Sequence, residues 1–274
     1  ALVINQVVLS VCQTVLLRIN VKWSPGKAAP FKEIKGLISF SMYAQVSSVL
    51  NFFSRNVDDV LIGKVLGTGT LGIYQLSYRL MIWPLQRVVN VIGQAMFPAL
   101  SLIRDDRERV KSIYLRVIGT VSLITFPMVT GAFAVSEPGI RFFLGEKWYG
   151  VIPIFQVLCL LGILQSISSS QGWIFLSQGR TDLHLKVRLV SITLIVLSFF
   201  IGISYGVMGV AVCYVIASSL VIPFQLHVAG SLIGVTLGEI VNRTGAVLLC
   251  AVAMAAAVMG IGELIPGQWP YLLT

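Results

Sequence analysis

The chain has 274 residues, of which 56% are hydrophobic and only 11% are charged, and its mean hydropathy is +0.89. Soluble domains carry about 25% charged residues, so soluble enzymes, nucleic-acid-binding modules and secreted disulfide scaffolds are poor candidates. We interpret the net charge of +9 as a topological signal, because the cytoplasmic loops of membrane proteins collect Lys and Arg.

Stretches without Asp, Glu, Lys or Arg recur along the chain, many of them near the length of about 20 residues that crosses a bilayer as a helix. A turn at Tyr205-Gly206-Val207-Met208-Gly209 divides the longest of these stretches, 189–238, into two helices. The sequence predicts an all-α, polytopic membrane protein with eight spans: 1–17, 37–66, 71–103, 112–136, 150–177, 185–204, 208–229 and 243–262. Basic residues gather in alternate loops, with Lys186 and Arg188 assigned to the fifth, which places the odd-numbered loops in the cytoplasm.

Two of the predicted spans carry polar residues at steps of three and four, which places them on one face of a helix. In span 37–66 this stripe is Ser41, Gln45, Ser48, Phe52, Arg55 and Asp59, with Asp58 beside it. In span 71–103 it is Gln75, Arg79, Trp83, Gln86, Asn90 and Gln94, with Arg87 beside it. We therefore expect the two helices to form a hairpin with facing polar stripes.

Charged side chains within hydrocarbon cost roughly 2.5–3.5 kcal/mol each on insertion scales, so the stripes should face protein or water. One interpretation is a structural ion pair between Arg55 or Arg79 and Asp58 or Asp59. The other is a hydrated, cation-lined cavity around Arg79 and Arg87 that holds an anionic substrate.

Span 150–177 is also polar, with Gln156, Gln165, Gln171, Trp173 and several serines. Serines often bond to their own helix backbone and allow helices to pack closely, which is one interpretation of this segment. The alternative is that Gln165, Gln171 and Trp173 contact a sugar, since amides suit hydroxyl groups and aromatic faces suit sugar rings.

One motif has the form D-x-x-x-I-G…L-G-x-Y. It begins at Asp58, passes through Gly63 and ends at Tyr74, and it is followed by Arg79, Pro84 and Phe97-Pro98-Ala99-Leu100. With Phe143-Leu144-Gly145-Glu146-Lys147-Trp148 and the 177–182 loop, this pattern resembles the bacterial polysaccharide transporter family. That family lies in the multidrug/oligosaccharidyl-lipid/polysaccharide flippase superfamily. The O-antigen and colanic-acid-exporter-like flippases are the most similar subtype, and the resemblance covers about residues 36–240.

The resemblance implies a two-lobe fold of roughly fourteen helices, of which this chain is a fragment. Residues 1–36 would end the first lobe and form the loop between lobes, 37–229 would be the second six-helix lobe, and 230–274 would begin a terminal helix pair. The implied function is translocation of undecaprenyl-diphosphate-linked oligosaccharides across the bacterial inner membrane, by alternating access, for exopolysaccharide or lipopolysaccharide synthesis. The implied partners are this substrate, membrane lipids and other polysaccharide-assembly proteins, with no nucleic acid.

On this hypothesis the candidate substrate-binding residues are Arg55, Arg79, Arg87, Trp83, Gln86, Asn90, Gln45 and Gln165. Asp58 and Asp59 are candidates for an ion pair or for coupling to H⁺ or Na⁺. No catalytic residue, metal site or cofactor is expected. A multidrug/cation antiporter of the same superfamily is an alternative, but it needs an acidic cavity. A membrane enzyme acting on lipid-linked sugars is a further one, although loop 137–149 offers Glu137, Arg141 and Glu146 without a histidine.

Overall fold

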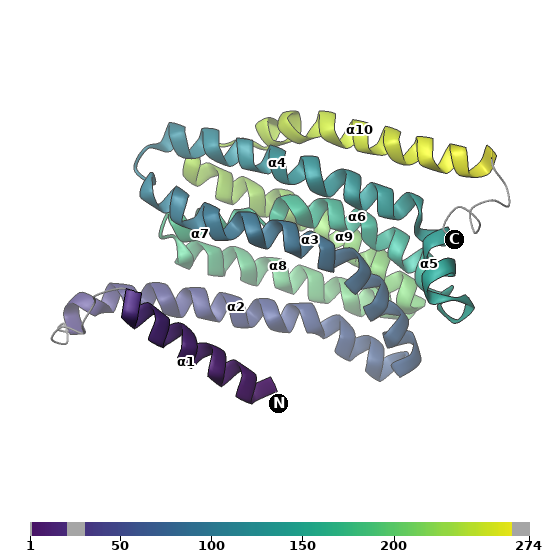
Figure 1. Ribbon diagram of the computed structural model, residues 1–274, viewed down its shortest axis with the longest axis horizontal. Coiled ribbons are helices and arrows are strands. Elements are labelled where there is room, and N and C mark those ends of the chain that lie inside the picture. The colour runs from purple at the N-terminus through teal and green to yellow at the C-terminus, as the bar shows by residue number, and fades with distance from the viewer. Residues whose placement is uncertain (1, 21–30, 265–274) are drawn as a thin grey trace. The chain divides into compact units, whose positions relative to one another are not determined.

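The computed structural model describes residues 2–20 and 31–264, and all regular structure in this part of the chain is helical. The chain divides into two units, Ala1–Ser39 and Phe40–Thr274. The first unit holds α1 (Leu2–Asn20) and the beginning of α2 (Phe31–Val65). The remaining elements belong to the second unit (Figure 1). The predicted domain boundaries at 36 and 229 stay predictions.

The second unit continues from α2 through a series of long helices, and its described part also contains four short helical elements, α5, η1, α7 and η2. Its elements are α3 (Thr68–Leu102), α4 (Arg107–Ala134), α5 (Ser136–Leu144), η1 (Glu146–Trp148), α6 (Val151–Ser168), α7 (Gln171–Ser177), α8 (Thr181–Gly202), η2 (Ile203–Tyr205), α9 (Gly206–Ile233) and α10 (Leu237–Leu264). Each predicted span coincides with a long helix, except that span 150–177 is broken into α6 and α7. Loop 137–149 is largely helical, as α5 and η1.

Among the described residues, four segments are long and apolar enough to cross a membrane: 107–134, 151–177, 181–233 and 237–262. The third contains both α8 and α9. An all-α, multi-pass membrane fold is therefore confirmed, whereas the number of eight spans stays a prediction.

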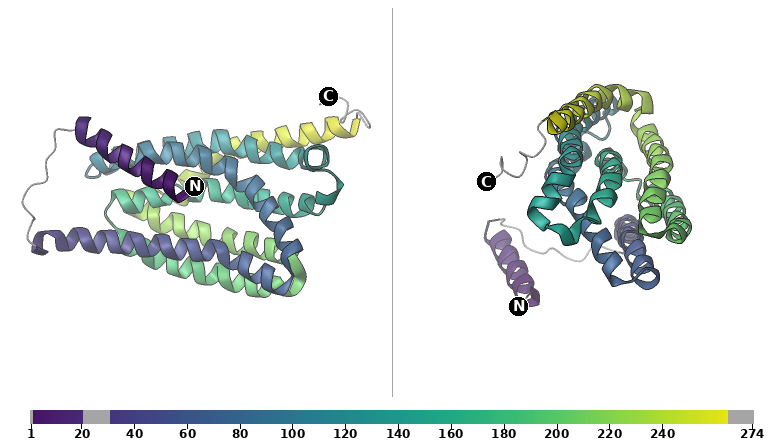
Figure 2. Two further views of the ribbon diagram at one scale, coloured as in Figure 1. Left: turned by 60° about the horizontal axis from the view of Figure 1, so that its bottom comes forward. Right: turned by 90° about the vertical axis from the view of Figure 1, so that its right-hand side faces the viewer.

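The long helices of the second unit lie side by side, α4 between α10 and α6, and α9 between α6 and α8, while α3 packs on α6 (Figures 1 and 2). Tight packing, rather than exclusion of water, stabilises such contacts between membrane helices. At one of them Gly162 of α6 lies against Met81 and Leu85 of α3, where an added Cβ would stand 3.0 Å from the Met81 sulfur. These contacts place α3, α6, α8 and α9 around the polar site described below.

The turn between α8 and α9 brings two helix backbones into direct contact. An added Cβ on Gly202 would lie 2.7 Å from the carbonyl oxygen of Gly209, and one on Gly209 would lie 2.5 Å from that of Gly202. Gly206, where α9 begins, has φ +74°, a conformation that favours glycine. A tight turn between the two helices is thus present, but it lies at Ile203–Tyr205, slightly before the predicted 205–209, and glycines at three positions make it possible.

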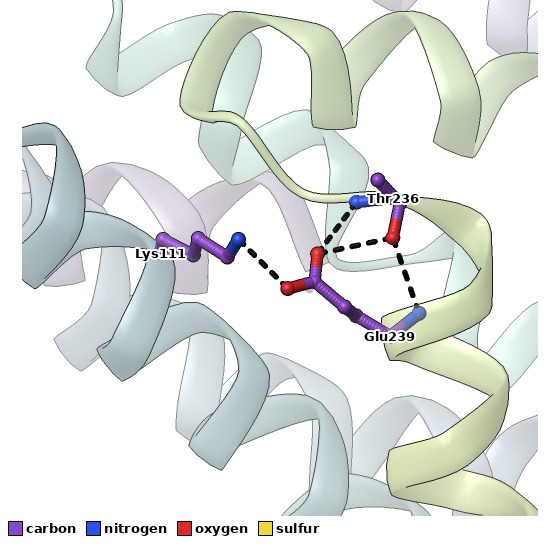
Figure 3. A network of polar contacts seen from close by, with 3 residues as sticks. All are labelled: Lys111, Thr236 and Glu239. Carbon is purple, nitrogen blue, oxygen red and sulfur yellow. Dashed lines mark hydrogen bonds and ion pairs between the residues drawn. The ribbon is translucent and has the colours of Figure 1, made fainter.

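The beginning of α10 is fixed to α4 by a polar network (Figure 3). Lys111 Nζ of α4 lies 2.7 Å from Oε1 of Glu239. The other carboxylate oxygen of Glu239 accepts a 2.9 Å hydrogen bond from the backbone N–H of Thr236, and the Glu239 N–H donates to the Thr236 hydroxyl at 3.3 Å. This reciprocal arrangement is a capping box. It starts the helix and also positions the carboxylate toward Lys111.

Candidate functional site

A polar cavity of about 640 Å³ lies within the second unit. Its walls come from α3, α6, α7, α8 and α9, with Asn51 contributed by α2. The described polar residues that line it are Asn51, Asn90, Gln94, Gln165, Ser168, Ser169, Gln171, Arg188, Ser191, Ser218 and Gln225. Such a concentration of amides and hydroxyls among apolar membrane helices is expensive unless the groups bond to one another, to water or to a ligand.

One wall of the cavity is a chain of buried hydrogen bonds that links three helices. The amide nitrogen of Gln171 in α7 donates to Oε1 of Gln225 in α9 at 2.6 Å. Gln225 in turn donates to the hydroxyl of Ser191 in α8 at 2.7 Å, and Ser191 donates to the carbonyl oxygen of Val187 at 2.7 Å. Because the amide nitrogens of Gln171 and Gln225 both have acceptors, the orientation of this wall is fixed.

A second group of residues surrounds the end of α6. Gln165 donates a 3.1 Å hydrogen bond to the hydroxyl of Tyr214, whose ring packs edge-on against Phe199 with centroids 5.0 Å apart. The indole of Trp173 lies against Gly93 of α3, where an added Cβ would stand 2.8 Å from its Nε1. The absence of a side chain at Gly93 is therefore what lets Trp173 stand at the cavity wall.

The serines near the break between α6 and α7 bond mainly to their own helix. The hydroxyls of Ser166, Ser168, Ser169 and Ser170 donate to carbonyl oxygens three or four residues earlier. The structural interpretation of these serines is therefore confirmed. The three residues singled out for sugar contact, Gln165, Gln171 and Trp173, do line the cavity together, while contact with a sugar stays a prediction.

Arg188 of α8 also lines the cavity, and it was missed as a site residue from the sequence. The alternation of basic loops predicts a cytoplasmic loop position for this residue, yet α8 begins at Thr181. Its guanidinium donates a 2.8 Å hydrogen bond to Oδ1 of Asn51 in α2. The available signal was that position 188 falls inside the predicted span 185–204.

These features can be compared with known proteins. Residues 1–153 match the family described as "Polysaccharide biosynthesis protein". The chain belongs to this family.

The similar proteins include two biosynthesis proteins of bacteria. Over 221 residues the chain is 29% identical to the teichuronic acid biosynthesis protein TuaB of Bacillus subtilis, covering 80% of this chain and 46% of the relative. Over 180 residues it is 27% identical to the lipopolysaccharide biosynthesis protein WzxC of Escherichia coli K12, covering 66% and 37%. A third relative, the probable low-salt glycan biosynthesis flippase Agl15 of the archaeon Haloferax volcanii, is 21% identical over 248 residues, covering 87% and 51%.

The chain thus spans about half the length of these relatives or less. No solved structure is significantly similar to it. The family match covers α1 to α5 and the first turn of α6. Most of the cavity walls, from Gln165 to Gln225, lie beyond it, so the structure rather than the family match identifies this site.

The predicted substrate-binding residues of this family member fall into three groups. Asn90 and Gln165 line the cavity. Gln45, Arg79, Trp83, Gln86 and Arg87 are not among the described lining residues. Arg55 is part of α2, but its side chain lies outside the described residues.

Arg79 and Arg87 are exposed on α3. The guanidinium carbon of Arg87 lies 5.1 Å from the ring centroid of Trp83, a cation–π contact within one helix. Neither arginine has a carboxylate within 4.0 Å among the described residues. Their role as substrate ligands stays a prediction.

The expected arrangement of α2 and α3 is found only in part. The two helices meet at the turn between them and separate away from it (Figures 1 and 2). Near the turn Asp58 is buried and accepts a 2.8 Å hydrogen bond from the hydroxyl of Tyr74. The predicted structural ion pair is not seen for Arg79: among the described side chains, no carboxylate oxygen of Asp58 or Asp59 lies within 4.0 Å of it. Pairing with Arg55 involves a side chain that is not described.

Proposed function

We propose that this protein moves lipid-linked oligosaccharide units across the bacterial inner membrane for the synthesis of an exopolysaccharide or lipopolysaccharide. The observation that carries the proposal is the polar cavity of about 640 Å³ inside a bundle of apolar helices. The names of the relatives support it, since they refer to lipopolysaccharide and teichuronic acid biosynthesis and to a probable flippase.

The chemistry of the cavity suits a glycan. Its volume lies in the range of about 300–1,000 Å³ that holds small organic ligands. Trp173 and Tyr214 offer aromatic faces and the amides offer hydrogen bonds to hydroxyl groups. The carbonyl oxygens of Gln165 and Gln171 are buried and have no hydrogen-bond partner in the described part of the chain. These two carbonyl oxygens therefore lack hydrogen-bond donors, and the hydroxyl groups of a bound sugar supply them.

Several finer features belong to the same proposal. The carrier is undecaprenyl diphosphate, and transport proceeds by alternating access between this lobe and a second one. Coupling to H⁺ or Na⁺ involves Asp58 or Asp59. These features follow from the resemblance, and other polysaccharide-assembly proteins are the expected partners.

The two alternatives are less well supported. A cation antiporter requires carboxylates in its cavity, whereas the described lining contains none. A membrane enzyme would draw on the acids of segment 137–149, where Glu137 is 2.6 Å from Arg141 in an ion pair. The guanidinium of Arg141 also lies over the ring of Tyr149, 5.0 Å from its centroid. The acidic residues of that segment are therefore best explained as structural rather than catalytic.

The test is transport by the intact protein in liposomes. A fluorescent lipid-linked oligosaccharide is placed in the bilayer, and a membrane-impermeant quencher reports the fraction in the outer leaflet over time. We expect exchange between leaflets to be much faster than in protein-free liposomes, and chemically unchanged substrate to be recovered. Exchange no faster than in empty liposomes would reject transport, and a modified glycan would favour the enzyme.

A further inference from the structure

We propose that α4 and α10 hold an anionic phospholipid, with its phosphate at Arg116 and Arg243 and one acyl chain in an apolar hollow farther along the same helices. The described linings of this hollow and of the polar cavity share no residue, so the inference does not depend on the proposed transport function. α10 lies at the edge of the second unit beside α4 (Figures 1 and 2), and only 11% of its membrane-spanning window is buried. Most of α10 is therefore open to lipid.

The two helices run in the same direction, as successive contacts between them show. Near their start, Gly119 of α4 lies against Arg243 of α10. Farther along, the hydroxyl of Thr130 in α4 donates a 3.1 Å hydrogen bond to the carbonyl oxygen of Ala251 in α10. The pair therefore forms one continuous seam, with a cationic end and an apolar end.

The cationic end holds two guanidiniums without an acidic partner. An added Cβ on Gly119 would lie 3.0 Å from Nε and 3.4 Å from Cγ of Arg243, so this side chain lies along the backbone of α4. Arg116 precedes Gly119 by three residues, a spacing that places both positions on one helix face. Both arginines are exposed, and neither has a carboxylate within 4.0 Å among the described residues, since Glu239 pairs with Lys111 at 2.7 Å. A phosphate beside the two guanidiniums reduces their repulsion and accepts hydrogen bonds from both.

The apolar end is a hollow of about 280 Å³ between α4, α6 and α10. Its described lining includes Val129, Phe133, Leu160, Val252, Ala256 and Met259. The hydroxyl of Thr130, which also lines it, is bonded to backbone carbonyl oxygens. The helix segment from Gly119 to Thr130 is about 16 Å long, close to half of the hydrocarbon thickness of about 30 Å. An acyl chain of the leaflet whose head groups lie at the arginines therefore reaches the hollow.

The side of the membrane also favours a phospholipid. The loops that precede α4 and α10 are odd-numbered and are predicted to be cytoplasmic. The cytoplasmic leaflet is the one that carries anionic lipids, and basic sites between membrane helices on this side bind their head groups. Two cations next to a hydrocarbon surface match a lipid with one phosphate and no compensating positive charge, such as phosphatidylglycerol.

The test is native mass spectrometry of the intact protein, titrated in detergent with phosphatidylglycerol, phosphatidylcholine or undecaprenyl diphosphate at equal concentrations. Arg116→Gln and Arg243→Gln remove the cations, and Lys186→Gln is the control, because Lys186 is an exposed cation of α8. Ala256→Phe fills the hollow from its exposed side, and Ala253→Phe is the control, because Ala253 is exposed on α10 outside the described lining. Size-exclusion elution of each variant verifies folding.

We expect the wild type and both controls to bind one phosphatidylglycerol more tightly than phosphatidylcholine. Each arginine variant should weaken phosphatidylglycerol binding by about tenfold, the usual loss for a hydrogen bond to a charged group, and Ala256→Phe should weaken the binding of both phospholipids. Equal affinity of the wild type for the two phospholipids, or unchanged binding in the arginine variants, would overturn the inference. Tighter binding of undecaprenyl diphosphate than of phosphatidylglycerol would overturn it in favour of a carrier-lipid site. A dimer that excludes lipid would overturn it in favour of a second copy of this chain on the same face.

Discussion

The hydroxyl of Tyr74 donates a 2.8 Å hydrogen bond to Oδ2 of Asp58, and both side chains are buried, at 1% and 4% exposure. These residues are the two ends of the D-x-x-x-I-G…L-G-x-Y motif, and they lie on opposite sides of the turn between α2 and α3. Between them, Ile62 is fully buried and an added Cβ on Gly63 would stand 3.1 Å from Leu71. The motif therefore specifies how the end of α2 packs on the start of α3.

Replacing Tyr74 with Phe should destabilise this turn. The other oxygen of Asp58, Oδ1, already has no partner within the described part of the chain, so the substitution leaves the buried carboxyl without either bond. We expect a loss of about 1–3 kcal/mol, the usual penalty for an unsatisfied buried polar group. It would be measured as a lower apparent melting temperature of the detergent-solubilised protein.

The matched control for that experiment is Tyr78→Phe, because Tyr78 stacks on Tyr74 with ring centroids 6.4 Å apart and this contact survives removal of the hydroxyl. Asp58→Asn combined with Tyr74→Phe should cost less than the sum of the single changes, since the two residues interact directly. Equal stability of Tyr74→Phe and Tyr78→Phe would contradict the role assigned to the hydrogen bond.

The close contact between α8 and α9 gives a second prediction. A Cβ at Gly209 would stand 2.5 Å from the carbonyl oxygen of Gly202, which is backbone and cannot rotate away. Gly209→Ala should therefore separate the two helices and cost about 1–3 kcal/mol, as overpacking usually does. Gly69→Ala is the control, because an added Cβ there meets nothing within 4 Å. A melting temperature for Gly209→Ala as high as that of the control would show that the helices adjust freely.

The positions of the long helices were predictable because a run of apolar residues without charge has one stable conformation in a bilayer, with its backbone bonded internally. The break after Ser168 was not predictable, since serines are compatible both with a continuous helix and with one whose hydroxyls replace backbone bonds. The stripe pattern identified one face of α2 and of α3 but could not show which helix that face meets.

Arg188 shows a different limit of prediction from the sequence. A basic residue near the end of a membrane helix fits the positive-inside rule whether it faces water, lipid or a cavity, so counting charges could not assign it. Its position depends on the approach of α2 to α8, across which it donates a hydrogen bond to Asn51. Gln165, Gln171 and Trp173 were easier to find, because polar and aromatic residues close together on one span stand out by composition.

At the start of α10 the carboxylate of Glu239 contributes both an ion pair and a capping box, and substitutions can separate the two. Lys111→Met removes the ion pair with Glu239 but keeps the capping box with Thr236, whereas Thr236→Val weakens the capping box and keeps the ion pair. We expect Thr236→Val to lower the melting temperature more, because surface ion pairs contribute little. The effect of Lys111→Met should also shrink as salt is raised. A larger and salt-independent effect of Lys111→Met would show that the pair is shielded from solvent.

The exposed arginines of α3 provide the last prediction. Neither Arg79 nor Arg87 has a carboxylate within 4.0 Å among the described residues, and a face carrying two cations is poorly suited to lipid. If this face borders the hydrated path of an anionic substrate, Arg79→Glu and Arg87→Glu should each abolish polymer export while membrane levels of the protein stay normal. Arg104→Glu is the control, because Arg104 lies beyond the end of α3 and its ion pair within the described residues is with its neighbour Asp105, at 3.7 Å. Export and immunoblots of the membrane fraction would be compared in cells lacking the native protein. Normal export by both α3 variants would reject the role.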